Sequence, residues 1–313
     1  MITEERKKDL EKQGYRLVGN HSATKVCLWT KKAIRAEDYC YKNTFYGIQS
    51  NRCIQMTPAL NCNQRCFWCW RDIDFTEASW TGEVDNPKDI VDGCIKEHIK
   101  YLEGFRGNPK SNKERFLEAQ RPLHFAISLS GEPTFYPKLP ELIREIKKRA
   151  MTSFLVTNGT NPGMLRKLVK NQPTQIYLTL AAPDEETYIK VCNPLIKDGW
   201  KKINESLSTL KKFKRSTIRL TLVNNQNMVK PEKYAKLIEK SSPAFVEAKA
   251  YMWVGYSRQR LGIEDMPLHD DIKKFAGKIA EYSSYKIVDE KKESRVVLLM
   301  KKDFKERKLK SLF

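Results

Sequence analysis

The chain has 313 residues, of which 58 are Lys or Arg and 38 are Asp or Glu, so its formal net charge is +20. It is long enough to bury a substantial core, and it has no apolar run near the roughly 20 residues of a membrane span, so we expect no membrane partner. The charge excess favours a polyanionic partner, most simply nucleic acid, although a lysine-rich proteome also raises charge.

The amino-terminal ten residues are charged and lack the apolar core of a targeting signal. We therefore expect a cytoplasmic protein. In that reducing compartment the eight cysteines serve as thiols or metal ligands and not as disulfides.

The order of predicted elements divides the chain into three parts. Residues 1–53 form an amino-terminal extension, 54–260 a repeating strand and helix array, and 261–313 a basic carboxy-terminal extension with two short β runs within 285–300. The six strands predicted by β-rich runs are residues 54–60, 123–129, 153–157, 175–181, 217–223 and 247–254. Helical periodicity is found in 90–102, 139–146 and 200–213, prolines at 162 and 231 are typical of helix starts, and 104–122 is a polar, basic insertion.

Six strands joined by crossover helices predict an α/β fold with a parallel sheet, closed or nearly closed as a partial (β/α)6 TIM-like barrel with both extensions attached. A flat doubly wound sheet is the alternative. Periodicity alone does not separate the two.

Cys62, Cys66 and Cys69 follow the first strand of the array with C-x3-C-x2-C spacing. Three thiolates can hold three irons of a cubane cluster and leave the fourth iron open for chemistry. In the alternative, Cys66 and Cys69 are half of a zinc site that Cys53 or one of the four histidines completes.

Cys27, Cys40 and Cys53 lie upstream with twelve residues between neighbours. Buried thiols that behave as small hydrophobes are one interpretation, and a second three-thiolate site is the other. Cys94, on an apolar helix face, and Cys192 are predicted to be structural.

Two further motifs follow predicted strands. Ser130-Gly131-Glu132 comes after the second strand, where glycine permits close backbone approach to a ligand and the carboxylate can accept hydrogen bonds from an ammonium group. Asn158 follows the third strand and Thr179 lies near the end of the fourth. Each is equally compatible with an ordinary turn or strand end.

Together, the three-cysteine loop with an aromatic before its last cysteine and the Gly131-Glu132 pair resemble the radical S-adenosylmethionine (SAM) enzymes. The resemblance implies that Cys62, Cys66 and Cys69 bind a [4Fe–4S] cluster whose open iron chelates SAM, which is cleaved to methionine and a 5′-deoxyadenosyl radical. It also implies SAM contacts from four polar positions and the glycine: Ser130, Gly131, Glu132, Asn158 and Thr179.

The upstream cysteine triplet, the segment 67–72 and the segment 129–134 narrow this resemblance to the wyosine-synthesis family of radical SAM enzymes acting on tRNA-Phe. The resemblance implies condensation of N1-methylguanosine-37 in the anticodon loop with two carbons of pyruvate, giving the tricyclic wyosine base. It further implies a second [4Fe–4S] cluster on Cys27, Cys40 and Cys53, and a separate electron donor of flavodoxin or ferredoxin type.

Lys42 is a candidate to form a Schiff base with the pyruvate ketone, since a lysine in cationic or apolar surroundings can lose its proton. A solvated surface lysine is the alternative. Six aromatic residues lie near predicted loop ends, where we expect one or two of them to stack on an RNA base: Trp68, Trp70, Phe135, Tyr136, Trp253 and Tyr256.

Two other functions are compatible with these patterns. One is a radical SAM enzyme with an auxiliary cluster that modifies a peptide. The other is a non-catalytic, metal-containing RNA-binding protein, which would bind tRNA without cleaving SAM.

Overall fold

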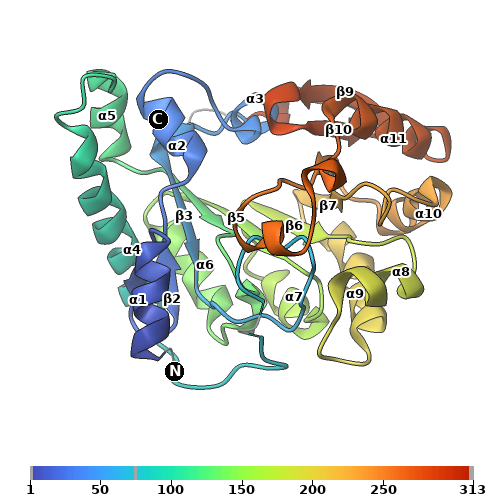
Figure 1. The fold of residues 1–313 in the computed structure, drawn as a ribbon, viewed down its shortest axis with the longest axis horizontal. Helices are drawn as coiled ribbons and strands as arrows, with labels where there is room; N and C mark the ends of the chain where they lie inside the picture. The colour runs from blue at the N-terminus through green and yellow to red at the C-terminus, as the bar shows by residue number, and fades with distance from the viewer. Residues whose placement is uncertain (1–2, 74–75, 310–313) are drawn as a thin grey trace.

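Ten β-strands form a single sheet in the computed structural model, which describes residues 3–73 and 76–309 (Figure 1). The strand order is β1-β2-β3-β4-β5-β6-β7-β8-β10-β9. The six central strands are parallel, and the outer pairs on both sides run antiparallel. The central strands are β3 Cys53–Thr57, β4 His124–Ile127, β5 Thr152–Thr157, β6 Gln175–Thr179, β7 Ser216–Leu222 and β8 Phe245–Ala250.

The order of these six strands identifies the architecture. They follow one another across the sheet as they do along the chain, without the reversal that defines a doubly wound sheet. The two edges of the sheet do not pair with each other. The partial (β/α)6 barrel is therefore confirmed, and the flat doubly wound alternative is wrong.

All six predicted strands are present, but five of them end before the predicted residue. β3 ends at Thr57 because Pro58 has no N–H to give to the sheet. After β8 the Tyr251 N–H still donates to the Leu222 carbonyl, and the chain then turns into a 3-10 helix. The apolar residues that extended these predictions form the loops at the carboxyl ends of the strands.

Helices connect the parallel strands, and their bounds follow local signals. Asn161 caps the helix α7 by accepting a hydrogen bond from the Met164 N–H, with Pro162 in its first turn. The helix α10 begins at Pro231, directly after Lys230, as the sequence predicted. The helices of the array are α4 Pro87–Leu102, α6 Leu139–Lys148, α7 Pro162–Leu168, α8 Glu185–Cys192, α9 Gly199–Thr209 and α10 Pro231–Ser241.

The predicted insertion contains a helix that the sequence did not signal, α5 Lys113–Ala119. Only Phe116 and Ala119 of this helix are buried, too few for a clear 3.6-residue pattern. They pack against Val26 and Leu102, so the insertion covers the amino-terminal region.

Both outer regions of the chain join the same sheet. The amino-terminal region contributes β1 Arg16–Val18 and β2 Ser22–Thr24, with the helices α1 Glu4–Lys12, α2 Leu28–Ile34 and α3 Tyr41–Tyr46. The carboxy-terminal region contributes α11 His269–Glu281 and the two predicted strands, β9 Lys286–Lys291 and β10 Val296–Met300. Division of the chain at residues 53 and 260 stays a prediction.

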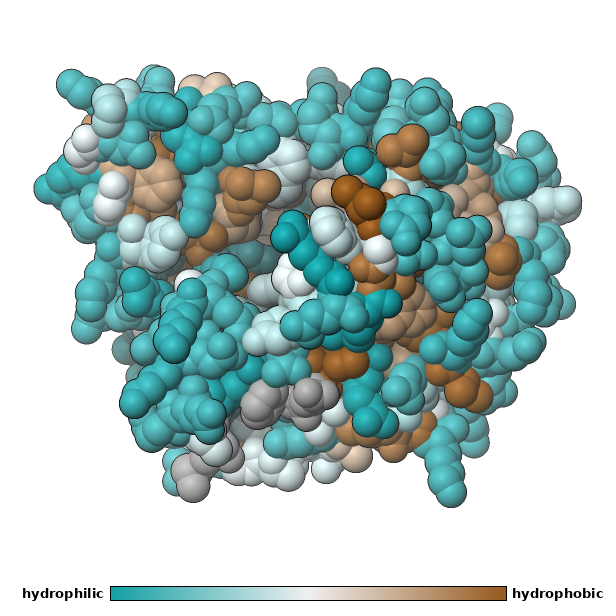
Figure 2. Space-filling view, viewed as in Figure 1, coloured by the Kyte–Doolittle hydropathy of each residue, from teal (hydrophilic) through white to brown (hydrophobic). Residues whose placement is uncertain are grey.

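Hydrophilic side chains cover most of the face drawn in Figure 2, as the charged composition requires. None of the helices in the described ranges combines the length and apolarity needed to cross a membrane.

Asn227 ties together the loops that follow β6 and β7. Its buried amide donates to the carbonyls of Ala181 and Thr221, both at 2.8 Å, and its oxygen accepts from the Val223 N–H at 2.7 Å. These loops form part of the wall of the cavity described below.

Replacing Asn227 with Ala removes three buried hydrogen bonds and leaves their backbone partners unsatisfied. We expect the free energy of unfolding to fall by about 2–4 kcal/mol, measured by urea denaturation. The exposed Gln259→Ala variant is the control and should stay within about 0.5 kcal/mol of the parent. An Asn227→Ala protein as stable as that control would contradict this role.

Candidate active site

A cavity of about 320 Å³ opens at the carboxyl ends of the parallel strands. Its walls include side chains from β5 to β8 that face the barrel interior, Val156, Thr179, Arg219, Thr221 and Lys249. Its mouth carries Cys62, Cys66 and Cys69 together with Ser130, Gly131, Glu132 and Asn158. One cavity therefore contains every residue predicted to contact the first cluster or SAM.

The three cysteines of the loop surround a buried guanidinium group. Arg71 is 5% exposed, and its charge acts on all three thiols, Cys62 most strongly. Burial raises the pKa of Cys62 to about 12 and raises the pKa of Cys69, while Arg71 lowers both. Burial disfavours ionisation of these three thiols, and the fixed Arg71 cation favours it. This arrangement fits a site where three thiolates hold a cluster.

Cys192 lies beside this loop, which the sequence did not reveal. A hydrogen bond between the thiols of Cys66 and Cys192 is the first cause of the raised pKa of Cys66, and burial is the second. The end of α8 also holds the loop directly, because the Arg65 N–H donates to the Cys192 carbonyl at 2.9 Å. Cys94 is buried in the apolar core on α4, as predicted.

Arg260 fastens the loop from the opposite side. Its guanidinium donates to the carbonyls of Phe67, at 3.1 Å, and Cys69. The Tyr256 N–H donates to the Trp70 carbonyl at 3.0 Å. The segment after β8 therefore fixes the backbone between the last two cysteines.

Gly131 is required by the chain's own path. It has φ +71°, and a Cβ there would lie 2.0 Å from the Ala59 carbonyl oxygen and 2.7 Å from that of Asn61. The next N–H, of Glu132, donates to the same Asn61 carbonyl at 2.7 Å. The backbone of residues 59–61, where the cysteine loop begins, therefore makes the close approach to Gly131 that was expected of a ligand.

Glu132 is buried and accepts four hydrogen bonds. Oε1 accepts from the Thr134 N–H at 3.0 Å and from the hydroxyls of Thr134 and Thr157 at 2.5 and 2.6 Å. Oε2 accepts only from the Asn158 N–H, at 2.7 Å. Burial raises the pKa of Glu132, and these bonds oppose the rise. A carboxylate oxygen readily accepts two or more donors, so Oε2, with one donor among the described residues, can accept another.

The remaining polar residues of the mouth differ in how far they are engaged. The Asn158 amide donates to the Asn63 side chain at 3.0 Å and approaches the Cys62 sulfur at 3.6 Å. The Ser130 hydroxyl is buried and lies beside the Tyr15 hydroxyl, whose pKa burial raises and Ser130 lowers. Thr179 is half-buried on the cavity wall.

The upstream cysteines form a second group at the other end of β3. Cys53 begins that strand, and Cys27 and Cys40 precede the short helices α2 and α3. The three thiols influence one another electrostatically, and burial raises the pKa of Cys40 to about 11 and raises that of Cys53 further. The chain therefore brings the three thiols within electrostatic range of one another.

Lys42 belongs to this second group and is 8% exposed, so the surface alternative is wrong. Its ammonium lies 5.2 Å from the ring centroid of Phe154 and 5.0 Å from that of Tyr177. Burial and then Arg219 lower its pKa, and Cys40 and Cys53 oppose this. Such an amine is easier to deprotonate than an exposed one.

The zinc alternative for Cys66 and Cys69 loses three of its possible ligands. Cys53 lies at the far end of β3, and both ring nitrogens of His21 and of His124 are engaged within the protein. Among residues 3–73 and 76–309, no three His, Cys, Asp or Glu side chains lie close enough together to hold a single metal ion, and this includes both cysteine triplets.

The six aromatic candidates for base stacking differ in their burial and in their contacts. Phe135 and Tyr136 are buried, and Trp70 stacks on Tyr15 at 5.9 Å. Trp253 is half-buried, with the Arg258 guanidinium 4.6 Å from its ring centroid. Trp68 lies on the cavity wall and is also half-buried, as is Tyr256.

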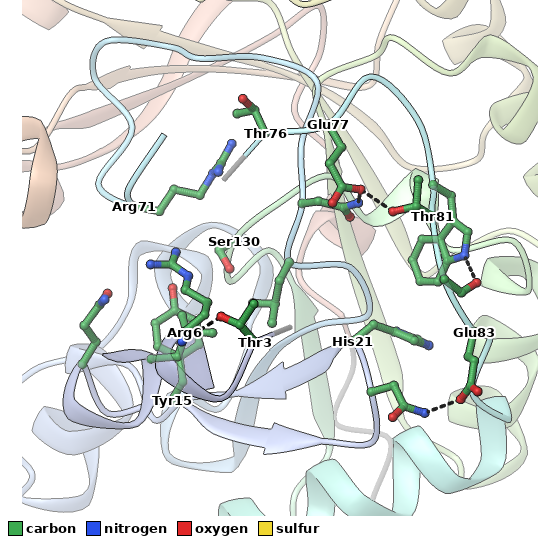
Figure 3. Close-up of a pocket in the computed structure, with 17 residues that line it drawn as sticks. Thr3, Arg6, Tyr15, His21, Arg71, Thr76, Glu77, Thr81, Glu83 and Ser130 are labelled. Atoms are coloured by element: carbon green, nitrogen blue, oxygen red, sulfur yellow. Dashed lines mark hydrogen bonds between the residues drawn. The ribbon is translucent and has the colours of Figure 1, made fainter. Parts of the chain in front are cut away.

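A second cavity, of about 270 Å³, lies on the other side of the cysteine loop. Figure 3 shows side chains entering it from the amino-terminal helix and hairpin and from the segment 76–83. Glu77 accepts hydrogen bonds there from Asn61 and Thr81, both at 2.7 Å. Ser130 and Arg71 line both cavities.

Known proteins resemble this chain over nearly its whole length. Residues 56–238 match the radical SAM superfamily, and residues 240–301 match the family described as wyosine base formation. A tRNA 4-demethylwyosine synthase of Pyrococcus abyssi is 49% identical over 298 residues, which is 93% of this chain and 87% of the relative. The chain belongs to the tRNA 4-demethylwyosine synthase family of radical SAM enzymes.

Other relatives agree. The synthase of Methanocaldococcus jannaschii is 40% identical and covers 97% of this chain and 98% of its own. A structure described as TYW1 with a lysine-pyruvate adduct bound has a TM-score of 0.89 and 39% identity over 99% of this chain and all of that one. An archaeal TYW1 crystal structure has a TM-score of 0.81 and 36% identity over the same shares.

Family membership confirms several predictions. The protein is a radical SAM enzyme of wyosine formation in tRNA, with SAM and a [4Fe–4S] cluster as cofactors. This membership excludes the two alternative functions, a peptide-modifying enzyme and a non-catalytic RNA-binding protein.

Replacing Gly131 with Ala should displace the cysteine loop, because the new Cβ would overlap backbone that cannot move aside cheaply. We expect loss of most of the iron bound by the loop and at least a tenfold drop in SAM cleavage, measured by iron content and 5′-deoxyadenosine. Gly277→Ala is the matched control, since nothing lies within 4 Å of its Cβ position. Full iron and activity in the Gly131 variant would refute the steric argument.

Proposed function

We propose that this enzyme condenses N1-methylguanosine-37 of tRNA-Phe with two carbons of pyruvate, in the cytoplasm, with two [4Fe–4S] clusters and a separate flavodoxin or ferredoxin donor. The observation that carries the proposal is that both cysteine groups adjoin one barrel interior. Arg219 and Lys249 line the cavity below Cys62, and Lys249 also acts on the Cys40 thiol. A radical formed at the mouth and a substrate held at the second group can therefore meet.

In this proposal Cys62, Cys66 and Cys69 hold the cluster that binds SAM. When bound, that cluster supplies the electron that cleaves SAM to methionine and the 5′-deoxyadenosyl radical. Arg71 stabilises the thiolates, and the Asn158 amide supports the Cys62 sulfur. The open position on Glu132 Oε2 accepts a hydrogen bond from the SAM ammonium group.

The loops around Glu132 contribute the other SAM contacts. The buried Ser130 hydroxyl and the Thr179 hydroxyl supply polar contacts from the cavity wall. Gly131 acts indirectly, because it allows the cysteine loop to pass against the strand-β4 loop.

Cys27, Cys40 and Cys53 hold the second cluster, and Lys42 binds pyruvate covalently. The neutral Lys42 amine attacks the pyruvate ketone carbon, and loss of water leaves an imine. A lowered pKa increases the neutral fraction of this amine at physiological pH. The related TYW1 structure with a lysine-pyruvate adduct, at 39% identity, supports this assignment.

The target base must leave its stack to reach the cavity, at a cost of a few kcal/mol. Phosphate contacts from the strongly basic chain offset that cost. The cavity rim carries the exposed apolar side chains Met252 and Val254, next to the half-buried Trp253. We assign base stacking to Trp253, because its partner cation Arg258 is itself exposed and able to contact phosphate.

The test is an anaerobic reaction of the reconstituted enzyme with SAM, a reductant, methylated tRNA-Phe and ¹³C-labelled pyruvate. We expect 5′-deoxyadenosine and a tricyclic base carrying two labelled carbons, and no product from Lys42→Met. Cleavage of SAM with no label in the tRNA would overturn the assignment of pyruvate.

Cysteine replacements should separate the two sites. Cys62→Ala should abolish SAM cleavage, whereas Cys40→Ala should halve the iron and leave cleavage that is uncoupled from base formation. Iron content and 5′-deoxyadenosine are the measurements, and Cys94→Ala, in the apolar core, should keep full iron. A Cys40→Ala protein with undiminished iron would disprove the second cluster.

Salt should weaken tRNA binding steeply, because each phosphate contact releases counterions. We expect the dissociation constant to rise by about 10³ or more between 50 and 200 mM salt if six or more phosphates are contacted. Filter binding with SAM present measures it. A flat salt response would mean that the positive charge serves something other than RNA.

A further inference from the structure

Lys249 is a second lysine in the barrel interior, and the predicted site does not include it. It lies on β8 and lines the main cavity. Its ammonium donates one hydrogen bond, to the Ser294 carbonyl at 2.7 Å. An ammonium group has three donors, and no acceptor for the other two lies within reach in the described residues.

The nearest carboxylate is not available to Lys249. Glu247 is fully buried, and its oxygens accept from the hydroxyls of Tyr46, at 2.7 Å, and Tyr41, at 3.1 Å, and from Arg219 Nε at 3.1 Å. No acidic group in the described ranges forms an ion pair with Lys249. An enclosed cation without an anion is unfavourable, and burial lowers the pKa of Lys249 to about 8.

Arg219 adds a second cation to the same wall. Besides its bond to Glu247 it donates to the Tyr41 hydroxyl at 2.5 Å, and its guanidinium lies 4.6 Å from the Tyr177 ring centroid. Nη1 has no acceptor among the described residues. Arg219 also lowers the pKa of Lys249 by charge repulsion, so a small anion beside both would relieve it.

We propose that Lys249 and Arg219 form the binding site for the carboxylate of the small 2-oxo acid substrate. This inference rests on the proposed function, which supplies pyruvate as that acid. Lys42 and Arg219 lie against the same Tyr177 ring, with their cationic groups 5.0 and 4.6 Å from its centroid, and both Lys42 and Lys249 act on the Cys40 thiol. The two amines therefore adjoin the same part of the interior. In pyruvate the ketone carbon is directly bonded to a carboxylate. The Lys42 amine can therefore react with the ketone while Lys249 and Arg219 bind the carboxylate.

The site also explains a preference among ligands. A neutral analogue with the same ketone, such as pyruvamide, offers no charge to the two cations. The wild-type enzyme should therefore bind pyruvate more tightly than pyruvamide, and removal of the Lys249 charge should reduce that difference.

The experiment compares Lys249→Met with the wild-type holoenzyme and with Lys286→Met, which removes an exposed lysine from β9. Cyanoborohydride reduces the imine by hydride addition, and mass spectrometry of the Lys42 peptide measures it as pyruvate or pyruvamide is varied. The pyruvate KM for base formation and the KM for SAM are measured in parallel, with iron content as the check on cluster assembly.

We expect Lys249→Met to raise the half-saturating pyruvate concentration and the pyruvate KM by about 10- to 100-fold, and to leave the KM for SAM unchanged. Lys249→Arg should restore most of the loss, and Lys286→Met should match the wild type. An unchanged pyruvate KM, or a raised KM for SAM in place of pyruvate, would overturn the site.

If Lys249→Met loses iron, the wild-type enzyme alone still tests the carboxylate site. Equal half-saturating concentrations of pyruvate and pyruvamide would exclude that site. Failure of the proposed function gives a different pattern. In that case the wild type neither traps pyruvate nor incorporates its carbons, whereas failure of this inference alone leaves incorporation intact and insensitive to Lys249.

Discussion

The structure depends on one close contact, between the backbone at residues 59–61 and Gly131. The chain leaves β3 at Pro58 and must turn at once against the loop that follows β4, where only a glycine leaves room. The same contact carries the hydrogen bond from Glu132 to Asn61. Because the cysteine loop begins here, its position follows from the packing of two strand ends.

That contact places a rigid loop over an interior that is unusually polar for a barrel. Small barrels are commonly filled by packed branched side chains. Here Lys42, Arg219, Lys249 and Glu247 occupy the interior, and only Arg219 and Glu247 are paired. Enclosed cations without an anionic partner lower stability, and under the proposed function the substrate carboxylate supplies that partner.

The sequence predicted the elements of the fold where a local feature, such as a β-rich run or a proline, coincided with burial or with a helix start in the structure. The strands of the array were found because all six are buried and β-rich, and α7 and α10 because proline marked their first turns. α5 was missed because only two of its residues face the core. Strand ends were placed too late where apolar residues, such as Tyr251, Met252 and Val254, line the cavity and not the sheet.

The site was predictable to the extent that its chemistry is local in sequence. Cys62, Cys66 and Cys69 lie within eight residues, so spacing alone identified them. Cys192 and Arg260 reach the same loop from more than a hundred residues away, and no spacing could indicate that. Gly131 was predicted for close approach of a ligand, and the structure shows that the chain's own backbone also requires a glycine there.

The two cysteine groups lie at opposite ends of a single short strand, and this arrangement constrains how they can work together. β3 has five residues, which span roughly 17 Å at about 3.3 Å each. Neither group can move toward the other without breaking the parallel pairing of β3 with β4. Under the proposed function, pyruvate is small enough to occupy the interior between the groups, where Arg219 and Lys249 present a cationic wall to its carboxylate.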